Sequence, residues 1–266
     1  MSTTLVKQLS VLADALPPCP AIYRQVVGAI QEEKPASAIG ALLARDVSTT
    51  ARILRVVNSA QFGLSRTICN PVEAVSILGT RTVRDIVLSS SITSHCSRGA
   101  EAIGFSIEEF TSFSINVAQL AARVAAMEST DDTLREQAFT AGVMHAVGRL
   151  VLMNHDPDEY LTAQAVSNVD SIPLWAAEKQ IFGVNYAEVG AFVLDRWNLP
   201  VPVVVAVGFH HKPHVQQSKA FCPLAAVHAA WGMHTYEGLD EDYLKSIGKL
   251  ERLPVWQKEL LSKPVG

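Results

Sequence analysis

Residues 131–151, DDTLREQAFTAGVMHAVGRLV, carry the periodicity that decides the fold. Apolar side chains recur there at four-residue intervals, at Phe139, Val143 and Val147. This spacing places them along one face of a helix that begins at one of the two leading aspartates. Similar spacing recurs along most of the chain, and we find no strict alternation bounded by hairpin turns. The sequence therefore predicts an all-α protein with about 13–15 helices.

Capping residues predict where individual helices begin and end. Ser37 and Ser48 each precede an apolar-periodic run, so we expect both to be N-caps. Asn70, which precedes a proline, predicts the start of a short helix that ends at Gly79. Ser106 followed by an acidic residue three positions later is typical of a capping box.

The clearest break in composition is residues 98–104, RGAEAIG, where two glycines favour a bend over a continued helix. We therefore expect an N-terminal helical lobe over residues 1–98, which opens with a helix over residues 5–16. A linker over 99–105, a second helical lobe over 106–238 and a helical extension over 239–266 would follow. Trp256 in the extension is expected either to support self-association or to fold back on the second lobe.

Composition excludes several classes of protein. The 266 residues carry 22 Lys and Arg against 26 Asp and Glu, a balance too mild for a nucleic-acid scavenger. No apolar stretch approaches the roughly 18 residues that span a bilayer, and the first residues do not form a secretory signal. The four cysteines are far apart and form no Cys-x-x-Cys pair, which argues against zinc knuckles and disulfide scaffolds. We expect a cytoplasmic protein that does not enter membranes.

A set of short stretches carries a family resemblance. In the first lobe they are RDVSTTAR (45–52), VNSA (57–60) and AVSILG (74–79). In the second lobe they are AGVMHAVGRL (141–150), AEVG (187–190), WNLP (197–200) and FHH (209–211). The set resembles the HDOD family, the HD-related output domains of bacterial signalling proteins, over most of the chain. The resemblance implies that the second lobe is related to HD phosphohydrolases.

The metal-binding positions that the resemblance implies are depleted. In HD phosphohydrolases a His, an adjacent His-Asp pair and a late Asp bind a divalent metal that activates water. Here Phe113 stands at the upstream His, Ala146 at the Asp beside His145, and Trp231 at the late Asp. Only His145 could still ligate, so we expect no metal, no cofactor and no enzyme activity. The expected function is regulation of signalling by binding a protein or a small ligand.

Two alternatives stay open at this point. One is a relic phosphohydrolase with an unusual metal site built from His145, His210 and His211, with His214 as an optional fourth ligand. The other is a phosphate- or nucleotide-binding module that uses arginines of the first lobe. Between residues 45 and 98, seven arginines stand against three acids. An ordinary solvated face, in which Arg81 pairs with Asp85, is the competing interpretation. No regularly interleaved aromatics accompany these arginines, which argues against a nucleic-acid platform.

Individual polar residues have structural as well as functional interpretations. We expect His145 to be a buried, hydrogen-bonded histidine. Of His210 and His211, one is expected to cap a carbonyl near a helix C-terminus as a partly positive ring, and the other to be solvated. Asn58 is expected to bond the loop of residues 61–65 or a neighbouring helix end, because Asn is a mediocre residue inside helices. Direct contact with a ligand is its alternative role.

The candidate binding site combines both lobes. We expect a cleft with Arg55, Asn58, Arg81 and Arg84 on one side and His145 and His210 on the other. A partner would then shift the population of lobe arrangements. The resemblance implies proteins of two-component or cyclic-dinucleotide signalling as partners, by analogy with the fold rather than from a site. Association with further copies of the chain is a further option.

Overall fold

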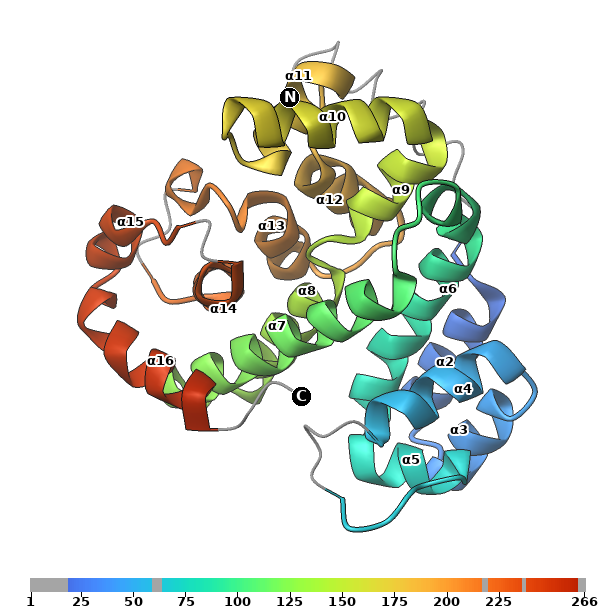
Figure 1. Cartoon of the computed structure of the whole chain (residues 1–266). Helices are drawn as coiled ribbons and strands as arrows, with labels where there is room; N and C mark the ends of the chain where they lie inside the picture. Colours follow the sequence, from blue (N-terminus) through green and yellow to red (C-terminus); the bar gives the residue numbers. More distant parts are fainter. Residues whose placement is uncertain (1–18, 59–63, 217–219, 236–237, 263–266) are drawn as a thin grey trace. The chain divides into compact units, whose positions relative to one another are not determined.

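The computed structural model of the chain describes residues 19–58, 64–216, 220–235 and 238–262. These residues form α-helices and short 3-10 helices without a strand, which confirms the predicted all-α fold (Figure 1). The helix expected over residues 5–16 lies outside the described residues. None of the described helices has the length and apolar character needed to cross a membrane.

The chain divides into two compact units, which we treat separately. Among the described residues, the N-terminal unit comprises residues 19–94 together with 259–262, and the C-terminal unit comprises residues 95–258. The division falls between Ser94 and His95, inside helix α6 (Thr80–Ala102). This helix does not bend at Gly99 as expected but continues to Ala102. A Cβ on Gly99 would lie 2.3 Å from the carbonyl oxygen of Met153, so this glycine serves close packing.

The N-terminal unit contains α2 (Ala21–Gln31), α3 (Ala36–Leu43), α4 (Val47–Val57), α5 (Pro71–Leu78) and the first part of α6. Helix α3 packs against α2 and α5, and α5 also contacts α4. Apolar side chains from these elements form the buried core, among them Val26, Ile39, Leu43, Ile53 and Ile68.

Some of the predicted caps are confirmed and others are wrong. Asn70 caps α5 by accepting from the backbone N–H of Val72, and Ser106 caps α7 (Ile107–Glu128). Ser37 and Ser48 are not N-caps. Helix α3 is preceded by Pro35, and Asp46 caps α4 because its carboxylate accepts from the N–H of Thr49 at 2.8 Å. An aspartate two residues earlier thus takes the role assigned to Ser48.

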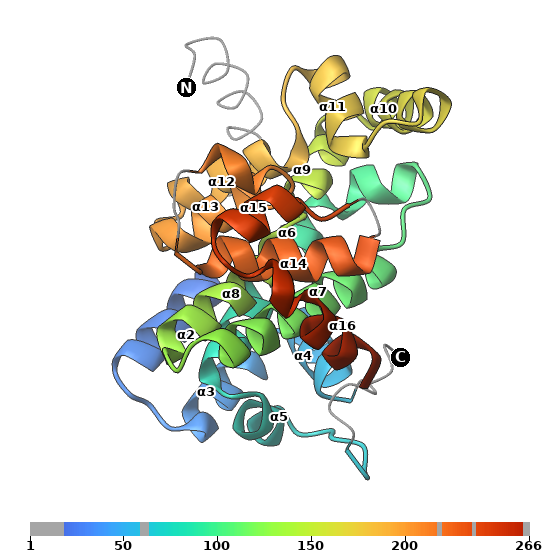
Figure 2. The ribbon, with the colours of Figure 1, turned by 90° about the vertical axis from the view of Figure 1, so that its left-hand side faces the viewer.

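The C-terminal unit holds the remaining helices. They are α7, α8 (Asp132–Met144), α9 (Val147–His155), α10 (Pro157–Asp170), α11 (Leu174–Phe182), α12 (Tyr186–Arg196), α13 (Val201–Phe209), α14 (Pro223–Thr235), α15 (Glu241–Ser246) and α16 (Leu253–Ser262). Helices α7 and α8 pack together, and α14 lies against both (Figure 2). Helix α12 packs between α9 and α13.

The stretch that predicts one long helix forms two. Helix α8 ends at Met144 and α9 begins at Val147, so His145 and Ala146 link them. The cause is tertiary packing, because the first turn of α9 approaches α12 closely. A Cβ on Gly148 would lie 2.0 Å from the carbonyl oxygen of Tyr186. The break places His145 at a helix end, where its side chain turns back onto the chain.

A buried carboxylate holds the C-terminal extension on α7. Glu128 accepts hydrogen bonds from Lys249 Nζ at 2.7 Å, Arg252 Nε at 2.6 Å and Trp256 Nε1 at 3.1 Å. Burial opposes the ionisation of Glu128, yet these three donors together hold its pKa below the ordinary value. The Trp256 side chain is fully buried, which confirms that it folds back on the second lobe.

We expect Glu128→Gln to destabilise the protein by about 2 kcal/mol. The substitution keeps the volume but leaves Lys249 and Arg252 without their charged acceptor; their partial exposure limits the loss. Urea unfolding followed by tryptophan fluorescence measures the change. The matched control is Glu251→Gln, which alters an exposed carboxylate in the same extension and should change stability by less than about 0.5 kcal/mol. Equal effects of the two substitutions would contradict the anchoring role.

Candidate functional site

The C-terminal unit brings two of the predicted site residues, His145 and His210, into contact. His145 follows α8 and His210 follows α13, and both side chains are fully buried. Their ring centroids are 5.4 Å apart and the rings are nearly perpendicular. Nδ1 of His145 lies 2.7 Å from the carbonyl oxygen of Gly142, and Nδ1 of His210 lies 2.8 Å from that of Val207. A carbonyl only accepts, so both rings carry their proton on Nδ1.

The two Nε2 atoms differ in their partners. Nε2 of His210 accepts a hydrogen bond from the Tyr186 hydroxyl at 2.9 Å. Nε2 of His145 is buried and has no hydrogen-bond partner among the described residues. His145 is therefore buried as expected but only half satisfied. An unpaired buried acceptor of this kind costs about 1–3 kcal/mol.

Aromatic rings pack against both histidines. The ring of Phe113 lies 5.5 Å from that of His145, and the ring of Trp231 lies 5.3 Å from that of His210. We call His145, His210, Phe113, Trp231 and Tyr186 the histidine cluster. Its side chains come from α7, α12 and α14 and from the ends of α8 and α13.

The expectations for the adjacent pair His210 and His211 need correction. His210 does cap a carbonyl at a helix end, as expected, but it is buried rather than partly positive. His211 is not solvated, because its ring stacks on Trp175 with centroids 4.7 Å apart. Lys212 Nζ lies 4.2 Å from the centroid of the same indole. The signal that sequence reasoning missed is Trp175, which is far from the pair in sequence.

Burial keeps these histidines neutral. It lowers the pKa of His145 to about 4, with smaller contributions from the positive charge of Arg149 and from His234. Burial likewise lowers the pKa of His211 to about 3, with further repulsion from Lys212. The pKa of His210 is also well below its ordinary value, chiefly because of burial. The cluster therefore carries no positive charge at neutral pH.

A further histidine, which sequence reasoning missed, connects three elements. His228 donates Nδ1–H to the carbonyl oxygen of His210 at 2.6 Å, and its Nε2 accepts from the backbone N–H of Asp240 at 2.9 Å. Asp240 caps α15 and its carboxylate lies 2.6 Å from Nδ1 of the exposed His214. A polar residue inside the apolar run of α14 was the available signal.

An arginine of the stretch AGVMHAVGRL (141–150), which also contains His145, fixes the surroundings of the histidine cluster. Arg149 donates from Nε to the Tyr160 hydroxyl at 2.8 Å and lies 5.4 Å from the ring centroid of Phe105. The carboxylate of the fully buried Glu178 accepts from the backbone N–H of Tyr186 at 2.8 Å. These contacts orient the start of α12, from which Tyr186 reaches His210.

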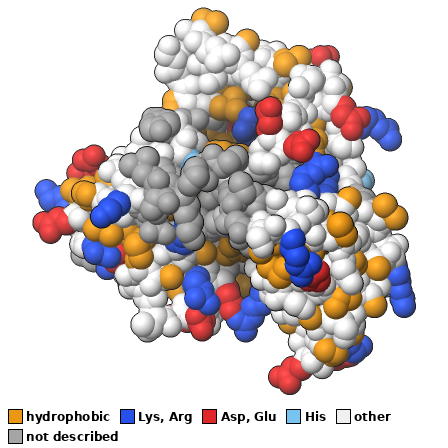
Figure 3. Space-filling model, turned by 60° about the horizontal axis from the view of Figure 1, so that its bottom comes forward, with side chains coloured by type: hydrophobic (Ala, Val, Ile, Leu, Met, Phe, Trp, Pro, Cys, Tyr) orange, Lys and Arg blue, Asp and Glu red, His pale blue; other side chains and the backbone are white. Residues whose placement is uncertain are grey.

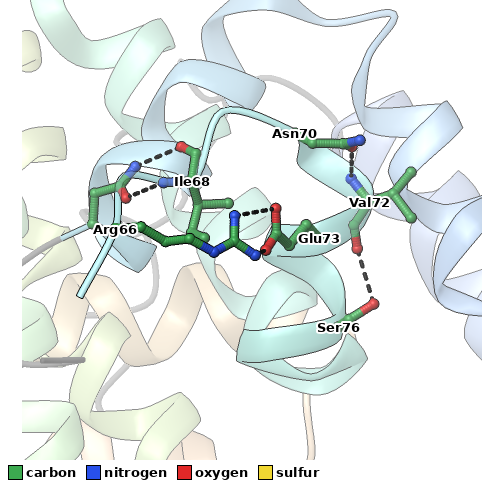
Figure 4. A network of polar contacts seen from close by, with 7 residues as sticks. Arg66, Ile68, Asn70, Val72, Glu73 and Ser76 are labelled. Carbon is green, nitrogen blue, oxygen red and sulfur yellow. Dashed lines mark hydrogen bonds and ion pairs between the residues drawn. The ribbon is translucent and has the colours of Figure 1, made fainter. Parts of the chain in front are cut away.

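In the N-terminal unit, Asn58 closes a loop. It follows α4 and donates from Nδ2 to the carbonyl oxygens of Leu54 at 2.8 Å and Ile68 at 2.7 Å. Its Oδ1 accepts from the N–H of Ile68 at 2.7 Å (Figure 4). Both ends of the amide are thus occupied by backbone, at Leu54 and Ile68 rather than in the expected residues 61–65. Ion pairing of Arg66 with Glu73 braces the same segment (Figure 4).

The predicted arginines lie on two helices of the N-terminal unit. Arg55 is in the last turn of α4, and its side chain is exposed. Arg81 is exposed in the first turn of α6, and Arg84 donates from Nε to the nearly buried Asp85 at 2.8 Å. The face drawn in Figure 3 carries acidic and basic side chains near one another. The cleft with His145 and His210 stays a prediction.

A hydrolytic metal does not fit the donor set of the cluster. Within the histidine cluster as described, Nε2 of His145 has no hydrogen-bond partner, while Nε2 of His210 already accepts from Tyr186; outside the cluster, Nδ1 of His211 is also without a partner. Ala146 and Trp231 supply no ligand atoms in place of carboxylates. Within the described residues, no group of three or more His, Cys, Asp and Glu side chains could hold a metal ion. His214, the optional fourth ligand of the relic site, pairs with Asp240.

The tautomers provide a direct test of this geometry. We expect His145, His210 and His228 to be neutral and protonated on Nδ1 at pH 7, because each donates to a backbone carbonyl. Long-range ¹H–¹⁵N correlation spectra of histidine-labelled protein report the protonated nitrogen of each ring. The exposed His155, whose ring no described hydrogen bond to a backbone carbonyl fixes, serves as the reference signal. Protonation on Nε2 in His145 or His210 would contradict the described hydrogen bonds.

Comparisons with known proteins give consistent results. A protein of Treponema pallidum (strain Nichols) without an assigned function is 27% identical over 221 residues, which cover 81% of this chain and 42% of that protein. The chain thus spans less than half of that relative's length. An HDOD domain protein of unknown function from Geobacter sulfurreducens has a similar structure, with a TM-score of 0.74 and 22% identity over 97% of this chain and 93% of that one.

Two further solved structures share the fold. One, from Shewanella amazonensis SB2B, is named only as a candidate phosphohydrolase; its TM-score is 0.71 at 24% identity, over 99% of this chain and 95% of that one. The other, from Marinobacter aquaeolei VT8, is named as a candidate signal transduction protein; its TM-score is 0.74 at 16% identity, over 97% of this chain and 62% of that one. The HDOD domain model matches residues 16–213. The chain belongs to the HDOD domain family.

Proposed function

We propose that the protein is a non-catalytic module of signal transduction that acts by binding. The observation that carries the proposal is the packing of Phe113 and Trp231 against His145 and His210. In the related hydrolases these places hold metal ligands, whereas here the rings and nitrogens are used for packing and for backbone hydrogen bonds. The C-terminal unit is then a rigid body, and its former active site contributes stability.

The binding surface that we propose lies on the N-terminal unit and centres on Arg55 and Arg81. Both side chains are exposed. His145 and His210 are fully buried and do not form part of a contact surface. An acidic face on a signalling protein is the complementary partner, since exposed guanidinium groups bind carboxylates and steer association.

Activity assays test the non-catalytic part of the proposal. The protein is incubated with Mn²⁺, Mg²⁺, Ni²⁺ or Fe²⁺ and with p-nitrophenyl phosphate, its bis ester or a cyclic dinucleotide. We expect the same background rate from the native chain and from His145→Leu. Hydrolysis that depends on added metal and is lost in His145→Leu would overturn the proposal in favour of a relic phosphohydrolase.

Affinity capture from the native cell tests the binding part. Three baits are compared: the native chain, a double variant with Arg55→Glu and Arg81→Glu, and a control with Arg24→Glu. The control reverses the charge of another exposed arginine of the same unit. We expect an acidic signalling protein to be retained by the native chain and the control, and lost from the double variant. Retention by all three baits would refute the assigned surface. Recovery of phosphate compounds with steep salt dependence would instead favour a nucleotide-binding module.

A further inference from the structure

Helix α6 contains a chemically distinct segment at the division between the two units. It is the longest described helix, with 23 residues. The run SSSITS at residues 89–94 ends where the division falls, between Ser94 and His95. Ser and Thr are weaker helix formers than Ala, because their hydroxyls compete for backbone hydrogen bonds. A run of five such residues in six is therefore an intrinsically weak part of a long helix.

Hydroxyl groups in this run bond to the helix itself. Ser91 Oγ donates to the carbonyl oxygen of Val87 at 2.9 Å, and Thr93 Oγ1 to that of Ser89 at 2.7 Å. Ser94 Oγ donates to the carbonyl oxygen of Ser90 at 2.9 Å. Each of these carbonyls then serves two donors, the hydroxyl and the backbone amide four residues on. Such side-chain bonds lengthen the backbone hydrogen bonds of the helix and favour its bending.

The two flanks of the run are held firmly. On one side Val83 and Val87 are fully buried, and Arg84 pairs with the buried Asp85. On the other side Gly99 lies so close to α9 that a Cβ would approach the carbonyl oxygen of Met153 to 2.3 Å. The run is also packed inward, with Ile92 and Thr93 buried, so what distinguishes it from its flanks is the set of hydroxyl bonds to the helix carbonyls, and a bend in α6 would concentrate there.

We infer that residues 89–94 form a hinge in α6, through which the two units change their arrangement. The inference goes beyond the proposed function, because it concerns the free protein and requires no partner. The hydroxyl-bonded turns absorb the change in direction by exchanging backbone for side-chain hydrogen bonds. Removal of the hydroxyls leaves the backbone ladder undivided and stiffens the helix.

Pulsed electron paramagnetic resonance tests the hinge on the full chain. One nitroxide is attached to the exposed Cys69 and the other to a cysteine introduced by Val169→Cys on α10, where the valine is 81% exposed. Cys19→Ser and Cys222→Ser remove the other accessible thiols. Cys96 needs no replacement, because it is buried and burial raises the pKa of its thiol to about 12.

The hinge variant combines Ser91→Ala, Thr93→Val and Ser94→Ala. We expect its distance distribution to be about twofold narrower than that of the labelled parent, since the hydroxyls that favour bending are gone. The control is Ser76→Ala, which removes the same kind of bond, to the carbonyl oxygen of Val72, from α5. This control should leave the width of the distance distribution unchanged.

Two outcomes would overturn the inference. The first is a hinge variant whose circular dichroism matches that of the parent but whose distance distribution has the same width. The second is a control whose distance distribution narrows as much as that of the hinge variant. If the triple variant does not fold, Ser94→Ala alone is measured, because its side chain is exposed and its removal leaves no buried gap. The hinge requires a smaller narrowing in this variant, and no narrowing would refute it. Failure of the partner capture described above would concern the proposed function alone, because the distance measurement uses the free protein.

Discussion

The C-terminal unit should lose its fold in acid before the N-terminal unit, in a first transition between about pH 6 and pH 4. All eight histidines of the chain lie beyond residue 94, so the N-terminal unit over residues 17–94 has none. Three of them, the buried His145 and His210 and the half-buried His211, are neutral and lie in one continuous run of ring contacts. No carboxylate pairs with these rings in the described residues, so an added proton would meet no counter-charge.

The sign of the effect follows from the direction of the pKa shifts. Burial lowers the pKa of His145 to about 4 and that of His211 to about 3, whereas both titrate near 6.5 when unfolded. Below pH 6.5 the unfolded chain therefore binds more protons than the native one. The contribution of these histidines to the free energy of unfolding is complete above pH 6.5. It decreases as the pH falls towards their pKa values in the folded protein, by up to about 1.4 kcal/mol per pH unit for each ring.

Together the three rings remove several kcal/mol by about pH 5, a large part of the stability of an ordinary domain. Two carboxylates, Glu128 and Asp240, also lose their contribution to stability in acid, but this loss begins at a lower pH than that of the histidines. Hydrogen bonds from cationic neighbours, against the opposing effect of burial, hold the pKa of Glu128 below its ordinary value. Asp240 likewise has a lowered pKa, through bonds from Tyr243 and His214 that outweigh its burial. Neither carboxylate begins to lose its contribution until the pH approaches the ordinary carboxyl range near about 4, whereas the histidines begin to lose theirs already below about pH 6.5.

Two spectroscopic signals separate the units. All four tryptophans, at positions 175, 197, 231 and 256, lie in the C-terminal unit, so intrinsic tryptophan fluorescence reports that unit alone. Far-ultraviolet circular dichroism reports the helices of both. We expect the fluorescence transition at a higher pH than the final loss of helical signal. Coincident transitions would show that the histidines do not set the acid stability of their unit.

Substitutions assign the effect to particular rings. His211→Phe keeps an aromatic ring on Trp175 and removes one titrating group, so the fluorescence midpoint should move to lower pH by about 0.5 units. His155→Gln removes an exposed histidine and should leave the midpoint unchanged. A midpoint that moves equally in both variants would point to a general charge effect.

Local signals in the sequence predicted the helices well, but not the side-chain environment of the candidate site. Asn70, Ser106 and Asp131 act on amides two or three residues away, so their capping roles are visible in the sequence. The partners of the histidines are remote: Tyr186 is 24 residues from His210. Burial and neutral charge at such positions depend on tertiary packing, which spacing does not reveal.

The break between α8 and α9 shows the same limit. Apolar spacing continues across residues 131–151, and nothing in the pattern interrupts the helix. Gly148 explains the break once α12 is in place, because a Cβ there would lie 2.0 Å from the carbonyl oxygen of Tyr186 and 2.8 Å from the backbone nitrogen of Gly190. The glycine is thus required by an approach of two helices that are distant in sequence.

Gly148→Ala should accordingly destabilise the protein by about 3 kcal/mol or more, because the atoms in the way are backbone and cannot rotate aside. Separation of α9 from α12 would also displace Tyr186 from His210. We expect the melting temperature to fall by about 6–12 °C, and the ¹⁵N signal of His210 Nε2 to shift as its hydrogen bond from Tyr186 is lost.

Gly28→Ala is the matched control, since a Cβ on Gly28 within α2 meets nothing within 4 Å. There the usual advantage of alanine over glycine inside a helix should stabilise the protein by about 0.5–1 kcal/mol. Opposite signs for the same chemical change separate close approach from helix propensity. Stabilisation by Gly148→Ala would mean that α9 and α12 are not in contact at this point, and that the break at His145 and Ala146 has another cause.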